Sequence, residues 1–146
     1  MKLQTTIINK FGKMAGWNSI SATMLGRTLE GITQLAYGDS QEVENVYGRG
    51  GKPIGRATGN YTPTASITLL KEEVIGLQLA VGPGNNIMDI DPFDISVLYE
   101  YKGIIYKDVI RNCQFTNNGV DVNQNDKTIS TQYTLLPSHI DWNMPV

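Results

Sequence analysis

Residues 93–101 alternate between apolar and other residues more regularly than the rest of this chain. The apolar positions are Phe93, Ile95, Val97, Tyr99 and Tyr101. Successive side chains of a β-strand point to opposite faces, so this period of two predicts a strand with one buried face. Ile, Val, Thr and Tyr are plentiful elsewhere, and the 15 Gly among 146 residues fall between short apolar stretches. These features predict a mainly β domain with many turns.

Further strands are predicted from shorter stretches of the same kind, at residues 27–37, 41–47, 61–70, 104–115 and 128–136. The first two are expected to pair as a hairpin around Gly38-Asp39-Ser40, because such residues favour turns. Residues 102–103, Lys-Gly, predict a second tight turn. Residues 3–8 fit either a short first strand or a docked arm.

Residues 70–80 change to the period of a helix, because Leu70, Val74 and Leu77 recur on one helical face. Thr68 is the expected N-cap, and the Gly-Pro-Gly sequence at 82–84 is expected to end the helix. The sequence therefore predicts one helix, over about residues 70–80.

Residues 47–60 read YGRGGKPIGRATGN and are predicted to form a long glycine-rich loop. Loops of this length in compact domains are usually functional or disordered. A phosphate-binding loop is disfavoured, because Gly51-Lys52 is followed by Pro53 where a Walker motif needs Ser or Thr. A mobile loop that becomes ordered on a partner is the preferred interpretation, and a solvated loop without a role is the alternative.

The order of elements predicts a small antiparallel β-sandwich or barrel with one flanking α-helix. The length supports a single domain over residues 1–146, with an N-terminal arm of about residues 1–25 and a C-terminal tail of about residues 137–146.

The composition excludes several classes of protein. With 12 Lys and Arg against 14 Asp and Glu, the net charge of −2 argues against a basic nucleic-acid groove. A single cysteine cannot form an internal disulfide and suits a reducing compartment. No apolar run approaches the roughly 20 residues that span a bilayer, and residues 1–10 lack the apolar core of a signal peptide. We therefore expect a soluble protein of intracellular origin.

No catalytic, cofactor-binding or metal-binding residues are predicted. Asp89, Asp91 and Asp94 lack the further ligands and the glycine of a calcium loop, and are expected to cap a turn. Cys113 and His139 are the only residues of their types, and Cys113 fits a buried strand position better than a nucleophile.

Two further features of the sequence need an interpretation. The adjacent Glu72 and Glu73 point about 100° apart on a helix, so they are expected to form a solvated face, not a catalytic pair. Trp17 and Trp142 lie near the two ends of the chain. Packing on this domain and docking on another subunit are equally good interpretations of them.

The middle of the chain resembles phage tail tube proteins. The resemblance is carried by a strand pair ending in Tyr47-Gly48, the glycine-rich stretch, the sequence GNYTPTASITL at residues 59–69, and the helix opened by Lys71-Glu72-Glu73. It covers residues 26–80 most specifically, and extends with a looser fit to residue 136.

The resemblance implies a structural virion protein that assembles into closed, typically hexameric rings, which stack into the tube through which DNA is delivered. Neighbouring strands would line the lumen, without specific DNA binding. The loop at 47–60 would reach the adjacent ring, with Tyr47, Arg49, Lys52 and Arg56 as inter-ring contacts. Partners would be other copies, the tail sheath, the baseplate or tail tip, the tape measure and the tail terminator. The protein would be located in the virion tail, and in the host cytoplasm before assembly.

Four interpretations of the function stay open. The first two are the tube subunit itself and a related ring component of a baseplate or contractile injection system. A soluble β-barrel that binds a small ligand is a third interpretation, and it predicts a monomer with an apolar cavity. An enzyme is the weakest interpretation, because no acid, base and nucleophile converge in the sequence.

Overall fold

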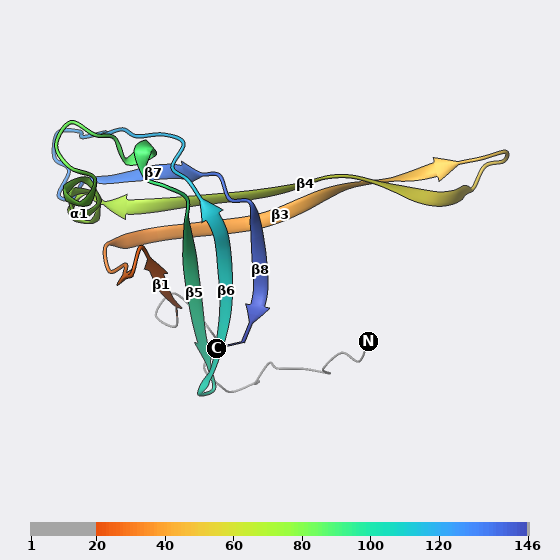
Figure 1. Cartoon of the computed structure of the whole chain (residues 1–146), viewed down its shortest axis with the longest axis horizontal. Helices are drawn as coiled ribbons and strands as arrows, with labels where there is room; N and C mark the ends of the chain where they lie inside the picture. Colours follow the sequence, from red (N-terminus) through yellow and green to blue (C-terminus); the bar gives the residue numbers. More distant parts are fainter. Residues whose placement is uncertain (1–19, 146) are drawn as a thin grey trace.

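The computed structural model describes residues 20–145 and contains two antiparallel sheets. The five-stranded sheet has the order β2-β1-β5-β6-β8, and the three-stranded sheet has the order β3-β4-β7. In Figure 1 the strands of the first sheet cross those of the second. The strands are β1 (Ile20–Met24), β2 (Arg27–Thr28), β3 (Ile32–Tyr47), β4 (Pro53–Leu70), β5 (Phe93–Tyr101), β6 (Ile104–Cys113), β7 (Ser130–Leu135) and β8 (His139–Met144).

The hydrophobic core lies between the two sheets. From β5, the alternating side chains Phe93, Ile95 and Val97 are buried, as the sequence pattern predicts. From β4, only the last part of the strand contributes, through Ala65, Ile67 and Leu69. Burial of each large side chain stabilises the fold by about 1.5–3 kcal/mol. The mainly β, two-sheet prediction is therefore confirmed, and the first part of β4 adds nothing to this core.

Helix α1 (Lys71–Val81) confirms the predicted helix, but its start differs from the expectation. The N-cap is Leu70, without a side-chain cap, because strand β4 runs directly into the helix. Thr68 still belongs to β4 and its hydroxyl donates to Gln34 Oε1 at 3.0 Å. The predicted N-cap was therefore wrong. A short 3-10 helix, η2 (Ile87–Asp89), follows the helix.

The expectation of a solvated pair at Glu72 and Glu73 holds only for Glu72. Glu73 is buried, and its Oε1 accepts a hydrogen bond from the backbone N–H of Gly31 at 3.1 Å. A Cβ atom at residue 31 would lie 2.4 Å from Cγ of Glu73, so only glycine fits there. The segment before β3 thus packs on the helix, a contact that local periodicity does not encode.

The largest difference from the sequence prediction is the hairpin of β3 and β4. The expected turn at residues 38–40 lies inside β3, which continues for 16 residues. Most of the expected loop at 47–60 is strand, because β4 begins at Pro53 and pairs with β3 along its whole length. Only residues 48–52 form the turn. Glycine at 59 permits this pairing, since a Cβ there would lie 2.9 Å from Cβ of Glu42.

Both expected terminal extensions contain strands of the five-stranded sheet. Residues 20–24 of the expected arm form β1, and 139–144 of the expected tail form β8. Strand β8 pairs with β6, so its backbone groups bond to the sheet where those of a solvated tail would bond to water. The expected strand at 27–37 is divided between β2 and β3. The residues expected as a first strand or docked arm, 3–8, lie outside the described part.

Candidate assembly surfaces

The hairpin of β3 and β4 projects far beyond the body of the molecule (Figure 1). Strand β4 pairs with β7 only from Ala65 to Leu70, so residues 53–64 have β3 as their only partner strand among the described residues. All side chains at 39–62 are exposed. Two-stranded ribbons alone are only marginally stable, and their open edges are templates for pairing with another chain. This hairpin is the main candidate for assembly contacts.

The residues predicted as inter-ring contacts lie together at the end of this hairpin. Tyr47 is the last residue of β3 and 60% exposed, Arg49 and Lys52 lie in the turn, and Arg56 follows on β4. The guanidinium of Arg56 donates to Asn45 Oδ1 at 3.4 Å. None of the three cations has an ion pair within the described residues. They are therefore free to meet acidic groups, and their contact with a next subunit stays a prediction.

The three-stranded sheet has an outer face, turned away from the core, that is polar and carries no cation. The hydroxyl of Thr68 and the amide of Gln132 both donate to Gln34 Oε1, at 3.0 and 3.4 Å, which places these three side chains on one face. No Lys or Arg occurs at 34–44 in β3, at 62–68 in β4 or in β7. By alternation, the outer face carries Gln34, Ala36, Ser40, Glu42, Glu44, Thr62, Thr64, Ser66, Thr68, Gln132 and Thr134.

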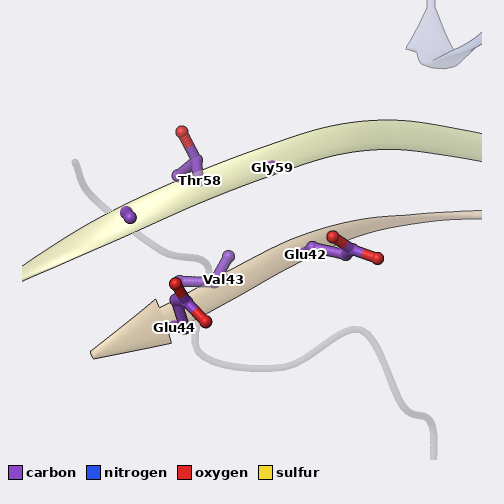
Figure 2. Close-up of a pocket in the computed structure, with 6 residues that line it drawn as sticks. Glu42, Val43, Glu44, Thr58 and Gly59 are labelled. Atoms are coloured by element: carbon purple, nitrogen blue, oxygen red, sulfur yellow. The ribbon is translucent and has the colours of Figure 1, made fainter. Parts of the chain in front are cut away.

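A hollow of about 410 Å³ lies midway along the projecting hairpin. Its lining residues are Glu42, Val43, Glu44, Ala57, Thr58 and Gly59. Figure 2 shows the side chains of Glu42 and Glu44 on one strand and Thr58 on the other. All six residues are exposed, and the lining includes no cation, histidine or cysteine. The hollow is a surface feature of the ribbon and lacks the enclosed apolar form of a small-ligand site.

A cluster of polar and aromatic side chains connects the base of the hairpin to β8. The carboxylate of Asp39 accepts hydrogen bonds from Tyr61 and from the indole N–H of Trp142, the latter at 3.0 Å. Trp142 also packs on Tyr37, with ring centroids 5.4 Å apart. The hydrogen bond from Tyr61, followed by that from Trp142, lowers the pKa of Asp39. Sequence reasoning missed this cluster, because Asp39 was expected in a turn and residues 137–146 in a tail.

The hydroxyl of Tyr37 extends the connection into the five-stranded sheet. It donates to Asp108 Oδ2 at 2.6 Å and contacts the hydroxyl of Tyr99. Burial, followed by the hydrogen bond to Asp108, raises the pKa of Tyr37 far above its usual value, so the hydroxyl stays protonated. These hydrogen bonds join the base of the hairpin, in the three-stranded sheet, to the five-stranded sheet. Trp142 packs on this domain, as one of its two interpretations expects, and remains half-exposed. Its docking on another subunit stays a prediction. Trp17 lies outside the described residues.

The other candidate residues have structural roles. The carboxylate of Asp94 accepts from the backbone N–H of Asn112 and pairs with Arg111, both at 3.0 Å, and these contacts lower its pKa. Asp89 closes a capping box on η2. Asp89 agrees with the expected turn-capping aspartates, whereas Asp94 lies in β5 and bonds to β6, so that the expectation is wrong for Asp94. No group of three or more residues that could hold a metal ion occurs within residues 20–145.

Cys113 and His139 do not form a nucleophilic pair. Cys113 is fully buried, and burial raises the pKa of its thiol to about 12. The imidazole of His139 is exposed and contacts Ser138 Oγ at 2.8 Å. The interpretation of Cys113 as a small buried hydrophobe is confirmed. In the described part, no helix is both long and apolar enough to cross a membrane.

Comparison with known proteins places the fold among components of tube-like assemblies. No known protein family model matches the chain, and no curated protein matches it. Among solved structures, the anti-feeding prophage cap, a tube-terminating cap, matches with a TM-score of 0.59 and 14% identity, over 96% of this chain and 97% of that one. A chain of the six-fold symmetrised anti-feeding prophage baseplate matches with a TM-score of 0.51 and 6% identity, over 83% and 88%. Hcp1 from Flavobacterium johnsoniae has a TM-score of 0.46 and 11% identity, over 84% and 92%.

These matches show that the chain has the fold of tube-cap and baseplate components. The resemblance to tail tube proteins is therefore supported at the level of the fold. The matched chains are parts of a tube-terminating cap and of a baseplate, and at these identities the likeness concerns the fold alone.

Proposed function

We propose that this protein is a structural subunit of a phage tail or related tail-like tube. Its copies form closed rings, hexameric by analogy with the six-fold baseplate, and the rings stack around a conduit for DNA. The observation that carries the proposal is the fold shared with a tube-terminating cap over nearly the whole of both chains.

The projecting hairpin supports self-assembly on physical grounds. Its outer strand edges have no partner among the described residues, and a monomer in isolation would leave their N–H and C=O groups to water. Pairing between the edges of neighbouring copies would satisfy these groups and close a ring. A ring built from one repeated contact is heterologous, and the same kind of contact between rings gives an open stack.

The outer face of the three-stranded sheet has the properties of a lumen wall. Apart from Ala36 its residues are polar, and its only charges are the carboxylates of Glu42 and Glu44. DNA binds proteins mainly through cations that contact its phosphates. A wall without cations would let DNA pass without being held. We therefore assign this face to the lumen of the proposed tube.

The second candidate function is a ring component at the end of a tube or in a baseplate. The observation that favours it is that the two matches with a TM-score above 0.5 are a cap and a baseplate chain. Both candidates place the protein in the virion tail, after synthesis in the host cytoplasm. Its partners would then be other copies, and the sheath, tail tip, tape measure and terminator proteins of the tail.

Negative-stain electron microscopy of the concentrated protein, with size-exclusion chromatography, tests both candidates. Long tubes of stacked rings are expected for the tube subunit. Isolated rings at every concentration would favour the cap or baseplate candidate. A monomer that stays monomeric up to millimolar concentration would contradict both.

A further inference from the structure

The two ends of the long axis carry different charges and the most exposed apolar side chains. Ile54 is 73% exposed and Leu79 is 78% exposed, which exceeds every other large apolar side chain in the described residues. Ile54 lies near the hairpin turn, and Leu79 lies in α1 at the opposite end (Figure 1). A single exposed apolar side chain is common on a protein surface, and it points to a contact surface only together with its neighbours.

The tip surface, at the hairpin end, is basic. We define it as Tyr47, Arg49, Lys52, Ile54 and Arg56. The chain contains no Asp or Glu from Val46 to Arg56, so the three cations are not neutralised locally. The hairpin carries this surface away from the body and leaves it accessible from several sides.

The helix-end surface, at the other end, carries two carboxylates, and the exposed Lys127 follows the second of them in the chain. We define it as Ile75, Leu79, Val120, Asp121 and Asp126. All five are exposed. In Figure 1, α1 and the segment between β6 and β7 lie at this end. A hydrogen bond from Lys71 N–H to Ile129 O at 2.9 Å joins the start of α1 to the end of this segment. The Asn118 amide of the segment donates to Asn86 Oδ1, at the start of η2, at 3.2 Å.

We propose that the tip surface of one copy docks on the helix-end surface of the next copy. This inference rests on the proposed function and names the receiving surface for the hairpin. Ile54 would pack against Leu79 and Val120, and Arg49 and Lys52 would face Asp121 and Asp126. Because the two surfaces lie at opposite ends of one chain, the contact is head-to-tail and leaves a free end for each further copy. Opposite charge sets the direction and speeds the encounter.

A charge exchange tests this docking. Arg49→Glu with Lys52→Glu reverses the tip surface, and Asp121→Lys with Asp126→Lys reverses the helix-end surface. Each double variant alone is expected to lower the assembled fraction in sedimentation by tenfold or more. The chain that carries all four changes should recover assembly to within about threefold of the unchanged protein, since both charges are exchanged. Glu100→Lys with Lys102→Glu, at the turn between β5 and β6, keeps the net charge unchanged, as the four-change chain does, and is the control for that chain. It should assemble normally.

Disulfide cross-linking tests the same contact without requiring long assemblies. A chain with Ile54→Cys is mixed with a chain with Leu79→Cys under oxidising conditions. The native Cys113 is buried, so the introduced thiols are the reactive ones. The 54–79 heterodimer should exceed by at least tenfold the heterodimer of Ile54→Cys with Ile105→Cys, a control at an exposed position on β6.

The outcomes separate this inference from the proposed function. If the unchanged protein forms rings or tubes, but exchange does not restore assembly and cross-linking equals the control, the docking is wrong and the structural function stands. If the unchanged protein forms neither and no preferential cross-link appears, both are wrong. Restored assembly with preferential cross-linking supports both.

Discussion

Asp39 is the residue on which the base of the projecting hairpin depends. Its carboxylate accepts hydrogen bonds from Tyr61 on β4 and from Trp142 on β8, and Tyr61 Oη in turn accepts from the backbone N–H of Ile140. Hydrogen bonds to a carboxylate are stronger than those between neutral groups. A single charged residue thus connects the two strands of the hairpin to the neighbouring sheet.

The lowered pKa of Asp39 predicts a pH-dependent contribution to stability. A carboxylate whose pKa is lowered by folding stabilises the protein above its unfolded pKa of about 4, and loses this effect as the pH falls through the folded value. Because Asp39 is exposed, we expect Asp39→Asn to lower the free energy of unfolding by about 1 kcal/mol or less at pH 7. At pH 3 the free energies of unfolding of Asp39→Asn and of the unchanged protein should differ less than they do at pH 7.

Urea unfolding followed by circular dichroism at both pH values measures this difference. Glu44→Gln removes another hairpin carboxylate, one without a hydrogen bond to any described residue, and is the control for net charge. A difference for Asp39→Asn that is equal at pH 7 and pH 3 would contradict the assigned role of the charge.

The element that governs the proposed assembly is the hairpin of β3 and β4. The part next to the body belongs to the core, because Leu35 and Tyr37 of β3 pack against the buried cluster that includes Ile67 of β4. In the projecting part, residues 39–62, all side chains are exposed. Ordering the projecting part of the hairpin costs conformational entropy, and no buried side chain offsets that cost. Contact with a partner would supply the missing burial. Folding and assembly therefore use different parts of the same two strands.

Shortening the hairpin should abolish assembly and leave the fold intact. Residues 42–60 are replaced by Asn-Gly, which suits a two-residue turn between the paired residues Gln41 and Tyr61. We expect a monomer whose melting temperature stays within a few degrees of the original, since the removed side chains are all exposed. Circular dichroism and negative-stain microscopy measure the two properties. Tubes of normal length from the shortened chain would refute the role of the hairpin.

At the scale of the whole molecule, charge is distributed by surface. The net charge is −2, but the tip surface is basic, the helix-end surface carries two carboxylates, and the only charges on the outer face are carboxylates. Electrostatic complementarity between the ends would orient successive copies, while the uncharged and acidic face would repel a polyanion. The subunit would thereby bind other copies of itself and would not bind DNA.

Cations on the outer face should convert the proposed conduit into a DNA-binding surface. Ser40→Lys with Thr62→Lys places two cations on paired positions of β3 and β4. Assembled material of this variant should retain double-stranded DNA in a filter assay at 50 mM salt and release it at high salt, because phosphate contacts are salt-dependent. Thr28→Lys with Asn143→Lys, on the five-stranded sheet, is the control. Equal retention by both variants would show that the outer face does not line the conduit.

The candidate assembly residues were only partly accessible to sequence reasoning. Arg49, Lys52 and Arg56 were recognised because cations and glycines gather in one segment, and they do lie at one end of the molecule. The receiving residues Leu79 and Asp121 were not, because each is unremarkable in its own segment. They become candidates because the folded chain places them at the end opposite the hairpin turn.

The amino-acid sequence by itself determined those features that a short window encodes. The alternation from Phe93 to Tyr101, the helical period from Leu70 to Leu77 and the buried strand position of Cys113 each follow from local side-chain spacing. Only the tertiary structure decided the rest. It carried β3 and β4 through a glycine-rich stretch, paired residues 139–144 with β6 and buried Glu73 against Gly31. Each of these depends on hydrogen bonds between residues distant in the chain, and no local pattern records which distant partner a backbone will find.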